Sequence, residues 1–239
     1  MPALIILVTV GLYAGALFLW VRAQSYRYTV ALVAGHLLVA MDPLWQWLYR
    51  YSYVDQGPSQ IFGRGVPLFA VLGVSWAYAL PALAFFYAQG QSWWPRSYWS
   101  GVGAFLGMLV YHVLLQGVAK QTALWRFDLP IMLSWGLPSW LVVALLGALV
   151  SLVTASVLSA TRHYAGFVFI PTLAAGIVVA PILVYGILGA PFWLPLLLDE
   201  SPALLSLGAL VTLALSIWVV HLACAGLQAP AERRVLGIR

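Results

Sequence analysis

Two sets of polar residues recur at helical spacing inside otherwise apolar stretches of the chain. Each set has an ionisable residue, then a glutamine, then a basic residue, four apart: Asp42, Gln46 and Arg50, then His112, Gln116 and Lys120. Residues four apart share one face of a helix. Carboxyl and imidazole groups serve as general acids and bases, so Asp42 and His112 are candidate catalytic residues.

Asp42 and His112 are predicted to lie at the same depth in two helices that run in the same direction. Each precedes the outer end of its helix by about six residues, or roughly 9 Å at 1.5 Å per residue. If the two faces meet, Asp42 and His112 can pair, with Gln46 and Gln116 above them in a polar funnel that binds substrate. Alternatively, these are interhelical contacts worth about 0.6 to 2 kcal/mol each that only fix the helix register.

Aromatic residues accompany the candidate acid. Trp76 and Tyr78 lie in the next predicted helix, and the stretch from Trp45 to Tyr53 is rich in Trp and Tyr. Aromatic faces stabilise cations, and apolar surroundings favour the neutral, proton-carrying form of a carboxyl group. An acid walled by Trp76 and Tyr78 is suited to carbocation chemistry on an isoprenoid. The alternative for Trp45 to Tyr53 is an aromatic belt at the lipid headgroups.

Part of the chain resembles known membrane enzymes of isoprenoid metabolism. The stretches 42–47 and 61–68, followed by Trp76, resemble a pattern in integral-membrane carotenoid hydratases and the G-x-P-L stretch ending in Trp of small membrane meroterpenoid cyclases. The similarity covers about 35 of 239 residues. The resemblance implies a hydratase or a cyclase-like lyase or isomerase. The cyclases carry a catalytic Glu directly after that Trp, where this chain has Ala77, which leaves Asp42 as the acid.

The composition places these residues in a membrane. The chain is 64% hydrophobic and 7% charged, with mean hydropathy +0.97, whereas soluble domains are roughly a quarter charged. Long unbroken apolar runs favour helices over a barrel. We therefore predict an all-α polytopic membrane protein, a single domain over 1–239 with about seven transmembrane helices in one bundle: 3–21, 29–48, 66–87, 98–118, 139–160, 165–188 and 202–224.

The basic residues predict the orientation of these spans. With the N-terminus outside, seven of them fall inside, Arg22, Arg27, Arg96, Arg162, Arg233, Arg234 and Arg239, and four fall outside, Arg50, Arg64, Lys120 and Arg126. Positive charge is enriched in cytoplasmic loops. We predict an integral protein of the cytoplasmic (inner) membrane with the N-terminus outside and the C-terminus inside.

Several function classes lack their usual signals. The basic residues are scattered singly, so no nucleic-acid partner is expected, and the seventh predicted helix has no lysine for a retinal Schiff base. The hydrolase, nucleotide-binding and metalloprotease motifs are missing, and Cys224 is the only cysteine. We expect no metal site and no cofactor. His36 lies on a different helix face from Asp42 and is interpreted as a packing or interface residue, and His221 lies near the inner end of the last predicted helix, where it can reach the lipid headgroups.

Three functions remain. The first is a membrane-embedded enzyme acting on a lipid or isoprenoid by acid-initiated chemistry. The second is a noncatalytic transmembrane subunit of a larger energy-converting or photosynthetic complex. The third is a transporter, which expects helices broken near the midplane, for which Pro81, Pro171 and Pro181 are the candidates. The expected partners are membrane lipids and either a hydrophobic small-molecule substrate or neighbouring membrane subunits.

Overall fold

The computed structural model describes residues 2–54, 60–61, 64–128, 132–163, 168–198 and 201–227. In this part the chain is nearly all helical, with seven helices long and apolar enough to cross a membrane: Ala3–Ala23, Arg27–Leu48, Leu68–Gly90, Tyr98–Gln121, Trp140–Ala160, Phe169–Leu188 and Pro202–Gly226. Their ends differ from the predicted ones by at most four residues. Residues 165–167 of the sixth predicted span lie outside the described residues.

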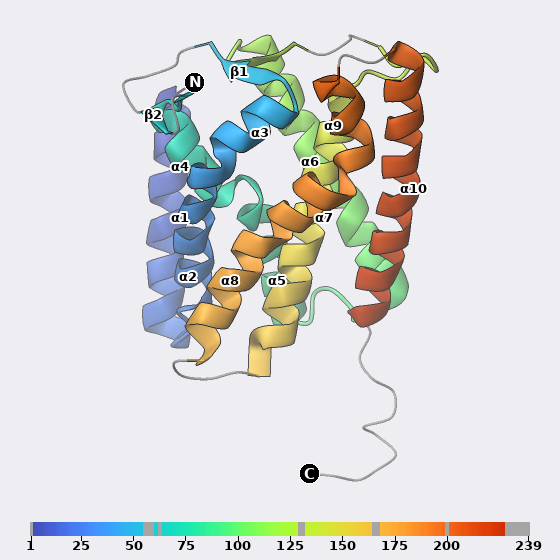
Figure 1. Ribbon diagram of the computed structural model, residues 1–239. Coiled ribbons are helices and arrows are strands. Elements are labelled where there is room, and N and C mark those ends of the chain that lie inside the picture. Colours follow the sequence, from blue (N-terminus) through green and yellow to red (C-terminus); the bar gives the residue numbers. More distant parts are fainter. Residues whose placement is uncertain are drawn as a thin grey trace.

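The elements, as labelled in Figure 1, are α1 (Pro2–Ala23), α2 (Arg27–His36), the 3-10 helix η1 (Leu37–Met41), α3 (Asp42–Leu48), β1 (Tyr51–Tyr53), β2 (Gln60–Ile61), β3 (Arg64–Gly65), α4 (Leu68–Ala77), α5 (Ala79–Gly90), α6 (Tyr98–Gln121), β4 (Trp125–Phe127), α7 (Trp140–Ala160), the 3-10 helix η2 (Thr161–His163), α8 (Phe169–Pro181), the π-helix η4 (Ile182–Leu188), α9 (Ala190–Leu197) and α10 (Pro202–Gly226).

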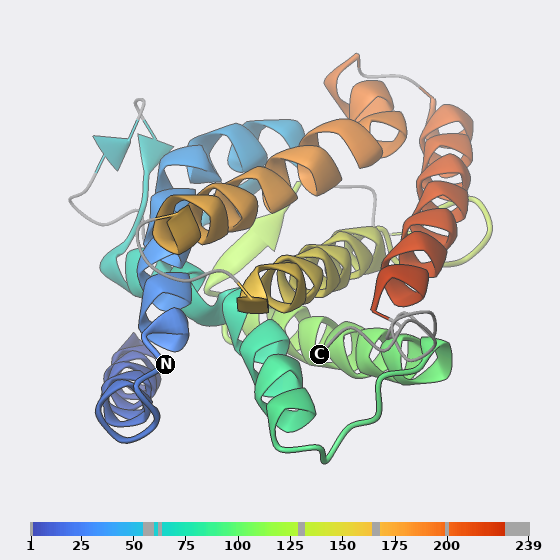
Figure 2. The same cartoon turned by 90° about the horizontal axis from the view of Figure 1, so that it is seen from below.

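These seven helices, which we call spanning helices for their length and composition, lie side by side, and successive ones run in opposite directions (Figure 1). α1 begins at the top of this view, which we call the outer end, and α10 ends at the bottom. α7 is the central helix, with 72% of its most apolar stretch buried, whereas the corresponding value for α1 is 11%. α1 lies at the edge of the bundle (Figure 2), where it packs against α2 and α4.

Three spanning helices are interrupted, each beside a proline. The second changes from α-helix to the 3-10 helix η1 and back at Asp42, directly before Pro43. The third is interrupted at Tyr78, three residues before Pro81, and the sixth widens into the π-helix η4 after Pro181. Proline lacks an amide hydrogen and clashes with the preceding turn, so regular α-helical hydrogen bonding cannot continue through it.

A two-stranded ribbon joins the outer ends of α3 and α6. β1 pairs antiparallel with β4, with Tyr51 opposite Phe127 and Tyr53 opposite Trp125. Backbone hydrogen bonds extend the pairing at both ends, from Val54 to Leu124 and from Asp128 to Arg50. The sequence analysis did not predict this ribbon. A second short pair, β2 with β3, follows β1 in the chain.

Close helix contacts at glycine bring the walls of the bundle together. A Cβ atom at Gly35 of α2 would overlap the backbone of Ser75 in α4, and one at Gly208 of α10 would overlap the backbone of Pro191 in α9. Small residues at such crossings allow membrane helices to pack backbone to backbone. The contact at Gly35 fixes α4, and with it Trp76, against the helix that leads to Asp42.

Candidate functional site

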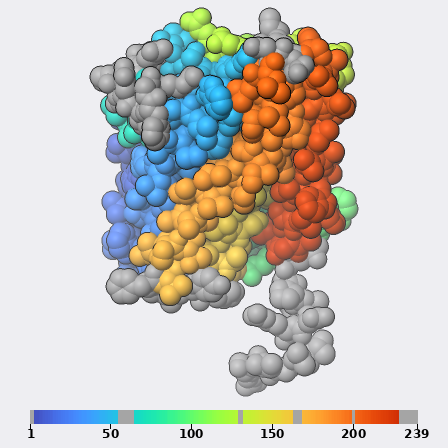
Figure 3. Space-filling view, in the orientation of Figure 1, coloured from blue at the N-terminus to red at the C-terminus, as the bar shows by residue number. Residues whose placement is uncertain are grey.

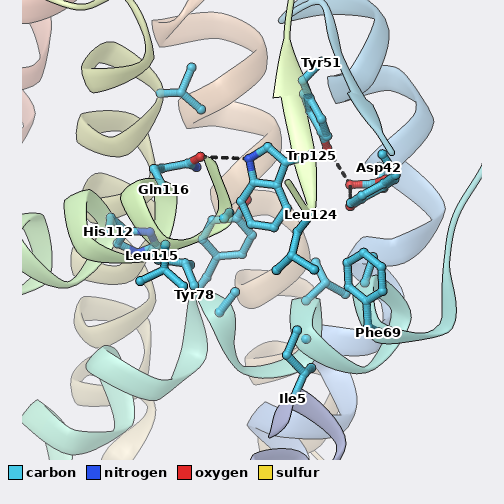
Figure 4. Close-up of a pocket in the computed structure, with 18 of the residues that line it drawn as sticks. Ile5, Asp42, Tyr51, Phe69, Tyr78, His112, Leu115, Gln116, Leu124 and Trp125 are labelled. Carbon is cyan, nitrogen blue, oxygen red and sulfur yellow. Dashed lines mark hydrogen bonds between the residues drawn. The ribbon is translucent and has the colours of Figure 1, made fainter. Parts of the chain in front are cut away.

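A cavity of about 250 Å³ lies in the outer half of the bundle, beneath the ribbon. Its walls come from α1, α3, β1, α4, α6, β4, α7 and η4, and most of the lining residues are aliphatic or aromatic. Figure 4 shows Asp42 on one side and His112 and Gln116 on the other, with Trp125 between them. The cavity therefore combines an apolar volume with a few polar groups, as ligand sites commonly do.

Asp42 is held by three side chains. Its Oδ1 accepts hydrogen bonds from the hydroxyls of Tyr51, at 2.6 Å, and Tyr53, at 3.1 Å, and its Oδ2 accepts one from Nε2 of Gln46, at 2.9 Å. The residue is 7% exposed. Gln46 reaches it because it lies one turn further along α3, and the tyrosines reach it because alternate residues of a strand point to the same face.

Tyr51 and Tyr53 are neutral hydrogen-bond donors to Asp42. Burial, and next the negative charge of Asp42, raise the pKa of Tyr51 well above its usual value of 10. The pKa of Tyr53 is raised in the same way, by burial first and by Asp42 second. Both hydroxyls therefore keep their protons and donate to Asp42 over the physiological pH range.

His112 is anchored at one nitrogen. Its Nε2 lies 2.9 Å from Oγ of Ser151, and that hydroxyl donates to the carbonyl oxygen of Tyr78, also at 2.9 Å. A carbonyl oxygen only accepts, so the single Ser151 proton is used there and Nε2 of His112 must be the donor to Oγ. In a neutral imidazole Nδ1 is then an acceptor, and within the described part of the chain it has no hydrogen-bond partner.

The ring of His112 is also packed on its faces. Tyr78 stacks on it, with ring centroids 5.7 Å apart and an interplanar angle of 22°. A Cβ atom at Gly147 of α7 would lie 2.6 Å from Nδ1 and 3.0 Å from the two neighbouring ring carbons. These contacts leave the imidazole, which is 1% exposed, in one orientation at the cavity wall.

Interrupted helices supply further aromatic walls. Tyr185 lies in the π-helix η4, where its carbonyl oxygen accepts hydrogen bonds from the Tyr49 hydroxyl at 2.7 Å and from Nε1 of Trp193 at 3.1 Å. Tyr185 also packs against Trp45, with ring centroids 5.7 Å apart. Asp42, Tyr78 and Tyr185, one from each interrupted helix, all line the cavity.

Five of the six predicted site residues line this one cavity: Asp42, Trp76, Tyr78, His112 and Gln116. Gln46 is not among the lining residues and instead holds the carboxylate of Asp42. Trp76 donates from Nε1 to the hydroxyl of Thr9 in α1, and Gln116 accepts from Nε1 of Trp125.

Asp42 and His112, which were expected to pair with each other, are hydrogen-bonded to other residues. The carboxyl oxygens of Asp42 accept hydrogen bonds from side chains of α3 and β1, and Nε2 of His112 is hydrogen-bonded to Ser151 of α7. Ribbon side chains, among them Tyr51 and Trp125, form part of the wall where an open polar funnel was expected. Asp42 and His112 thus line the same cavity, and each has its own hydrogen-bond partners.

The sequence did not identify Ser151 and Trp125 as site residues, and it placed Tyr51 and Tyr53 in the aromatic stretch after Asp42 without predicting that they bind its carboxyl group. The alternation Tyr51-Ser52-Tyr53 is a strand signal that could have placed both tyrosines on one face. Nothing in the sequence around Ser151 distinguishes it from other small polar residues in apolar helices.

The other two histidines lie elsewhere. Nδ1 of His36 is 3.1 Å from the carbonyl oxygen of Val71, and its ring stacks on Tyr13. Nδ1 of His221 is 3.1 Å from the hydroxyl of Tyr98 on an exposed face. Neither lines the cavity. In the described ranges no group of three His, Cys, Asp or Glu side chains is placed to hold a metal ion.

The fold and the cavity define a class: a bundle of seven helices of membrane-spanning length, with a carboxyl and an imidazole at one apolar cavity. Comparison with protein-family models, with curated proteins and with solved structures finds no match to this chain.

Proposed function

We propose that the protein is a membrane-embedded enzyme that acts on a lipid or isoprenoid substrate by acid-initiated, carbocation chemistry. The observation that carries this proposal is the Asp42 carboxyl, 7% exposed and held by two tyrosine hydroxyls at the wall of an apolar, aromatic cavity of about 250 Å³. The partial resemblance to carotenoid hydratases and meroterpenoid cyclases agrees with the same chemistry.

Asp42 acts as the general acid. Its carboxyl proton passes to one carbon of a substrate double bond, the π electrons form the new C–H bond, and the positive charge develops on the neighbouring carbon. Tyr51, Tyr53 and Gln46 stabilise the carboxylate that remains, since hydrogen bonds to the charged form of an acid favour that form. Geometry for proton donation is thereby set before the substrate arrives.

His112 completes the reaction. Nδ1 takes a proton from a carbon next to the cation, and the C–H electrons form a new double bond, which gives an isomer or a cyclised product. Alternatively, water adds to the cation and releases a proton, which gives a hydrated product. Ser151 and the Tyr78 carbonyl stabilise the protonated imidazole through Nε2. His112 then releases its extra proton to solvent, and a solvent proton restores the acid form of Asp42.

The aromatic walls stabilise the cation between these two steps. Trp45, Trp76, Tyr78, Trp125 and Tyr185 all line the cavity. A cation over an aromatic face gains about 0.5 to 2 kcal/mol, and more where water is excluded. Ring faces do not react with the cation as water or a carboxylate would, so they protect it until Nδ1 or a water molecule ends the reaction.

We also propose that the seven helices span the cytoplasmic (inner) membrane with the N-terminus outside, as the distribution of basic residues indicates. α1 begins at the end of the bundle where the β1–β4 ribbon lies (Figure 1). Because this ribbon lines the cavity, the site belongs to the outer half of the bilayer in this orientation.

The test compares wild type with Asp42→Asn, which keeps the size of the side chain and removes its acidity. Both proteins are reconstituted into vesicles with a lipid extract of the source membrane, and the lipids are followed by mass spectrometry. We expect wild type alone to convert one lipid into an isomer or a hydrate. Asp128→Asn, on an exposed residue next to β4, is the matched control and should behave as wild type. Equal conversion by wild type and Asp42→Asn would refute the proposal.

Transport is a second candidate, because three spanning helices are interrupted at residues that line the cavity or adjoin it. Transport moves a molecule across the vesicle without changing it, whereas the enzyme changes its structure. Accumulation of an unaltered compound inside wild-type vesicles, together with unchanged lipids, would favour transport.

A further inference from the structure

Two residues of the cavity wall are also exposed on the outside of the bundle. Leu4 of α1 lines the cavity and is 53% exposed, and Val118 near the outer end of α6 lines it and is 44% exposed. A side chain with both properties marks a place where a cavity reaches the surface. Both are apolar and belong to spanning helices, so the surface reached there is the one that faces lipid.

Two other sides of the cavity are covered by described residues. Its roof is the β1–β4 ribbon, with Tyr51, Tyr53 and Trp125 in the wall. On the face shown in Figure 3, α2 and α3, then α8 and α9, then α10 pack side by side without a visible hollow. α8 packs against α2, and α9 packs against α10, which agrees with a sealed face.

Of the seven spanning helices, α1 is the least buried by the rest of the protein. It packs on α2 and α4, and its most apolar stretch is 11% buried. Ile5, Val8 and Gly73 all line the cavity, and a Cβ built at Gly73 of α4 would make an ordinary contact, 3.5 Å, with Cγ2 of Ile5 in α1. A side chain at Gly73 longer than that of alanine would therefore have to enter the cavity or displace Ile5.

We propose that the cavity opens laterally to the lipid between α1 and the outer end of α6, and that it takes a membrane-dissolved molecule with a long apolar chain. This inference rests on the proposed function for the reactive end of that molecule, which lies at Asp42. The cavity volume of about 250 Å³ is small beside the roughly 300 to 1,000 Å³ of typical small-molecule sites. A long chain must leave through the opening at Leu4 and Val118 and remain in the bilayer.

The experiment uses photolabelling, which does not require turnover. The full-length protein in phosphatidylcholine vesicles is irradiated with hexadecanol carrying a diazirine in mid-chain, and labelled residues are located by mass spectrometry. We expect labels at the rim residues Leu4 and Val118 and at the interior residues Phe69 and Trp125. A butanol diazirine, which is water-soluble, should label the interior poorly because the ribbon covers the outer end.

Gly73→Leu places a side chain in the opening and should reduce interior labelling by about tenfold while the rim stays labelled. Gly73→Ala, whose Cβ makes an ordinary contact, and Gly107→Leu, at an exposed position of α6 with nothing within 4 Å, are the matched controls and should label as wild type. If Gly73→Leu does not fold, Val118→Trp obstructs the opposite rim and replaces it.

Interior labelling by butanol that exceeds labelling by hexadecanol, or a Gly73→Leu variant that labels as wild type, would overturn the lateral opening. Asp42→Asn separates the two proposals. If it leaves hexadecanol labelling unchanged while neither it nor wild type converts any lipid, the opening stands and the proposed chemistry fails.

Discussion

Nε2 of His112 lies 2.9 Å from Oγ of Ser151, and this one hydroxyl connects a buried imidazole to the backbone of another helix, at the carbonyl of Tyr78. Three spanning helices meet there: α6 supplies the histidine, α7 the serine and the break between α4 and α5 the carbonyl. Because Ser151 is the only hydroxyl in this chain of hydrogen bonds, it fixes which nitrogen of His112 is free.

Ser151→Ala should therefore affect both stability and activity. It leaves Nε2 of His112 without its acceptor and costs about 1 to 3 kcal/mol in the free energy of unfolding, because a buried donor loses its partner. Ser156→Ala is the control on the same helix, since that hydroxyl bonds only to the Leu152 carbonyl of its own helix, and it should change stability by at most about 0.5 kcal/mol. Thermal unfolding in detergent measures both, and equal shifts would contradict the role given to Ser151.

Gly147→Ala should displace His112. The added Cβ would lie 2.6 Å from Nδ1, and the ring cannot retreat freely because Tyr78 stacks on it and Ser151 holds Nε2. We expect a loss of about 1 to 3 kcal/mol in stability, as for other overpacked interiors, together with reduced lipid conversion. Gly107→Ala, at an open position of α6, should be neutral or stabilising by up to about 1 kcal/mol. A Gly147→Ala protein as stable and active as wild type would show that His112 has room to move.

Tyr51→Phe should weaken the hydrogen bonding that holds Asp42 in place. The variant removes the 2.6 Å hydrogen bond to Oδ1 of Asp42 and keeps those from Tyr53 and Gln46. A hydrogen bond contributes about 0.5 to 1.5 kcal/mol to stability, so we expect a lower melting temperature. Hydrogen bonds to charged groups are stronger, about 1.5 to 3 kcal/mol, so the loss of one to the Asp42 carboxylate that forms in the reaction should slow lipid conversion. Tyr53→Phe removes the longer bond, 3.1 Å, and should have the smaller effect. The reverse order in both measurements would contradict this geometry.

Alkaline pH should destabilise the protein through the same tyrosines. The pKa values of Tyr51 and Tyr53 are raised well above 10 in the folded protein, by burial first and by Asp42 second. Between pH 10 and those raised values the unfolded chain loses protons that the folded chain keeps, so stability is complete below pH 10 and falls as pH rises above it. Each tyrosine contributes a slope of about 1.4 kcal/mol per pH unit. Melting temperatures between neutral and strongly alkaline pH should therefore fall less steeply in Tyr53→Phe than in wild type.

The spanning helices could be predicted from the sequence because each depends on a single apolar run of sufficient length. The placement of Asp42 and His112 at one cavity also followed from local information, namely their distance from the ends of two helices that run in the same direction. Two of the three prolines named as candidates for broken helices, Pro81 and Pro181, lie beside an interruption, whereas Pro171 lies in the first turn of α8. The interruption beside Pro43 was not predicted.

The hydrogen-bond partners of Asp42 and His112 could not be predicted from the sequence in the same way. Tyr51 and Tyr53 reach Asp42 because β1 pairs with β4, more than seventy residues further along the chain. Ser151 meets His112 through the packing of α6 on α7. Both arrangements depend on contacts between distant segments, which hydropathy and spacing do not encode. A direct pair of Asp42 with His112 was inferred because those closer partners were unknown.

Deuterium incorporation tests the central claim, that Asp42 gives a proton to a substrate double bond, most directly. Wild type, Asp42→Asn and Asp128→Asn in vesicles are incubated in heavy water with the lipid extract of the source membrane, and the lipids are analysed by mass spectrometry. We predict that wild type and Asp128→Asn place deuterium on a carbon of one converted lipid and that Asp42→Asn does not. Conversion without carbon-bound deuterium, or equal incorporation by Asp42→Asn, would contradict acid-initiated chemistry at Asp42.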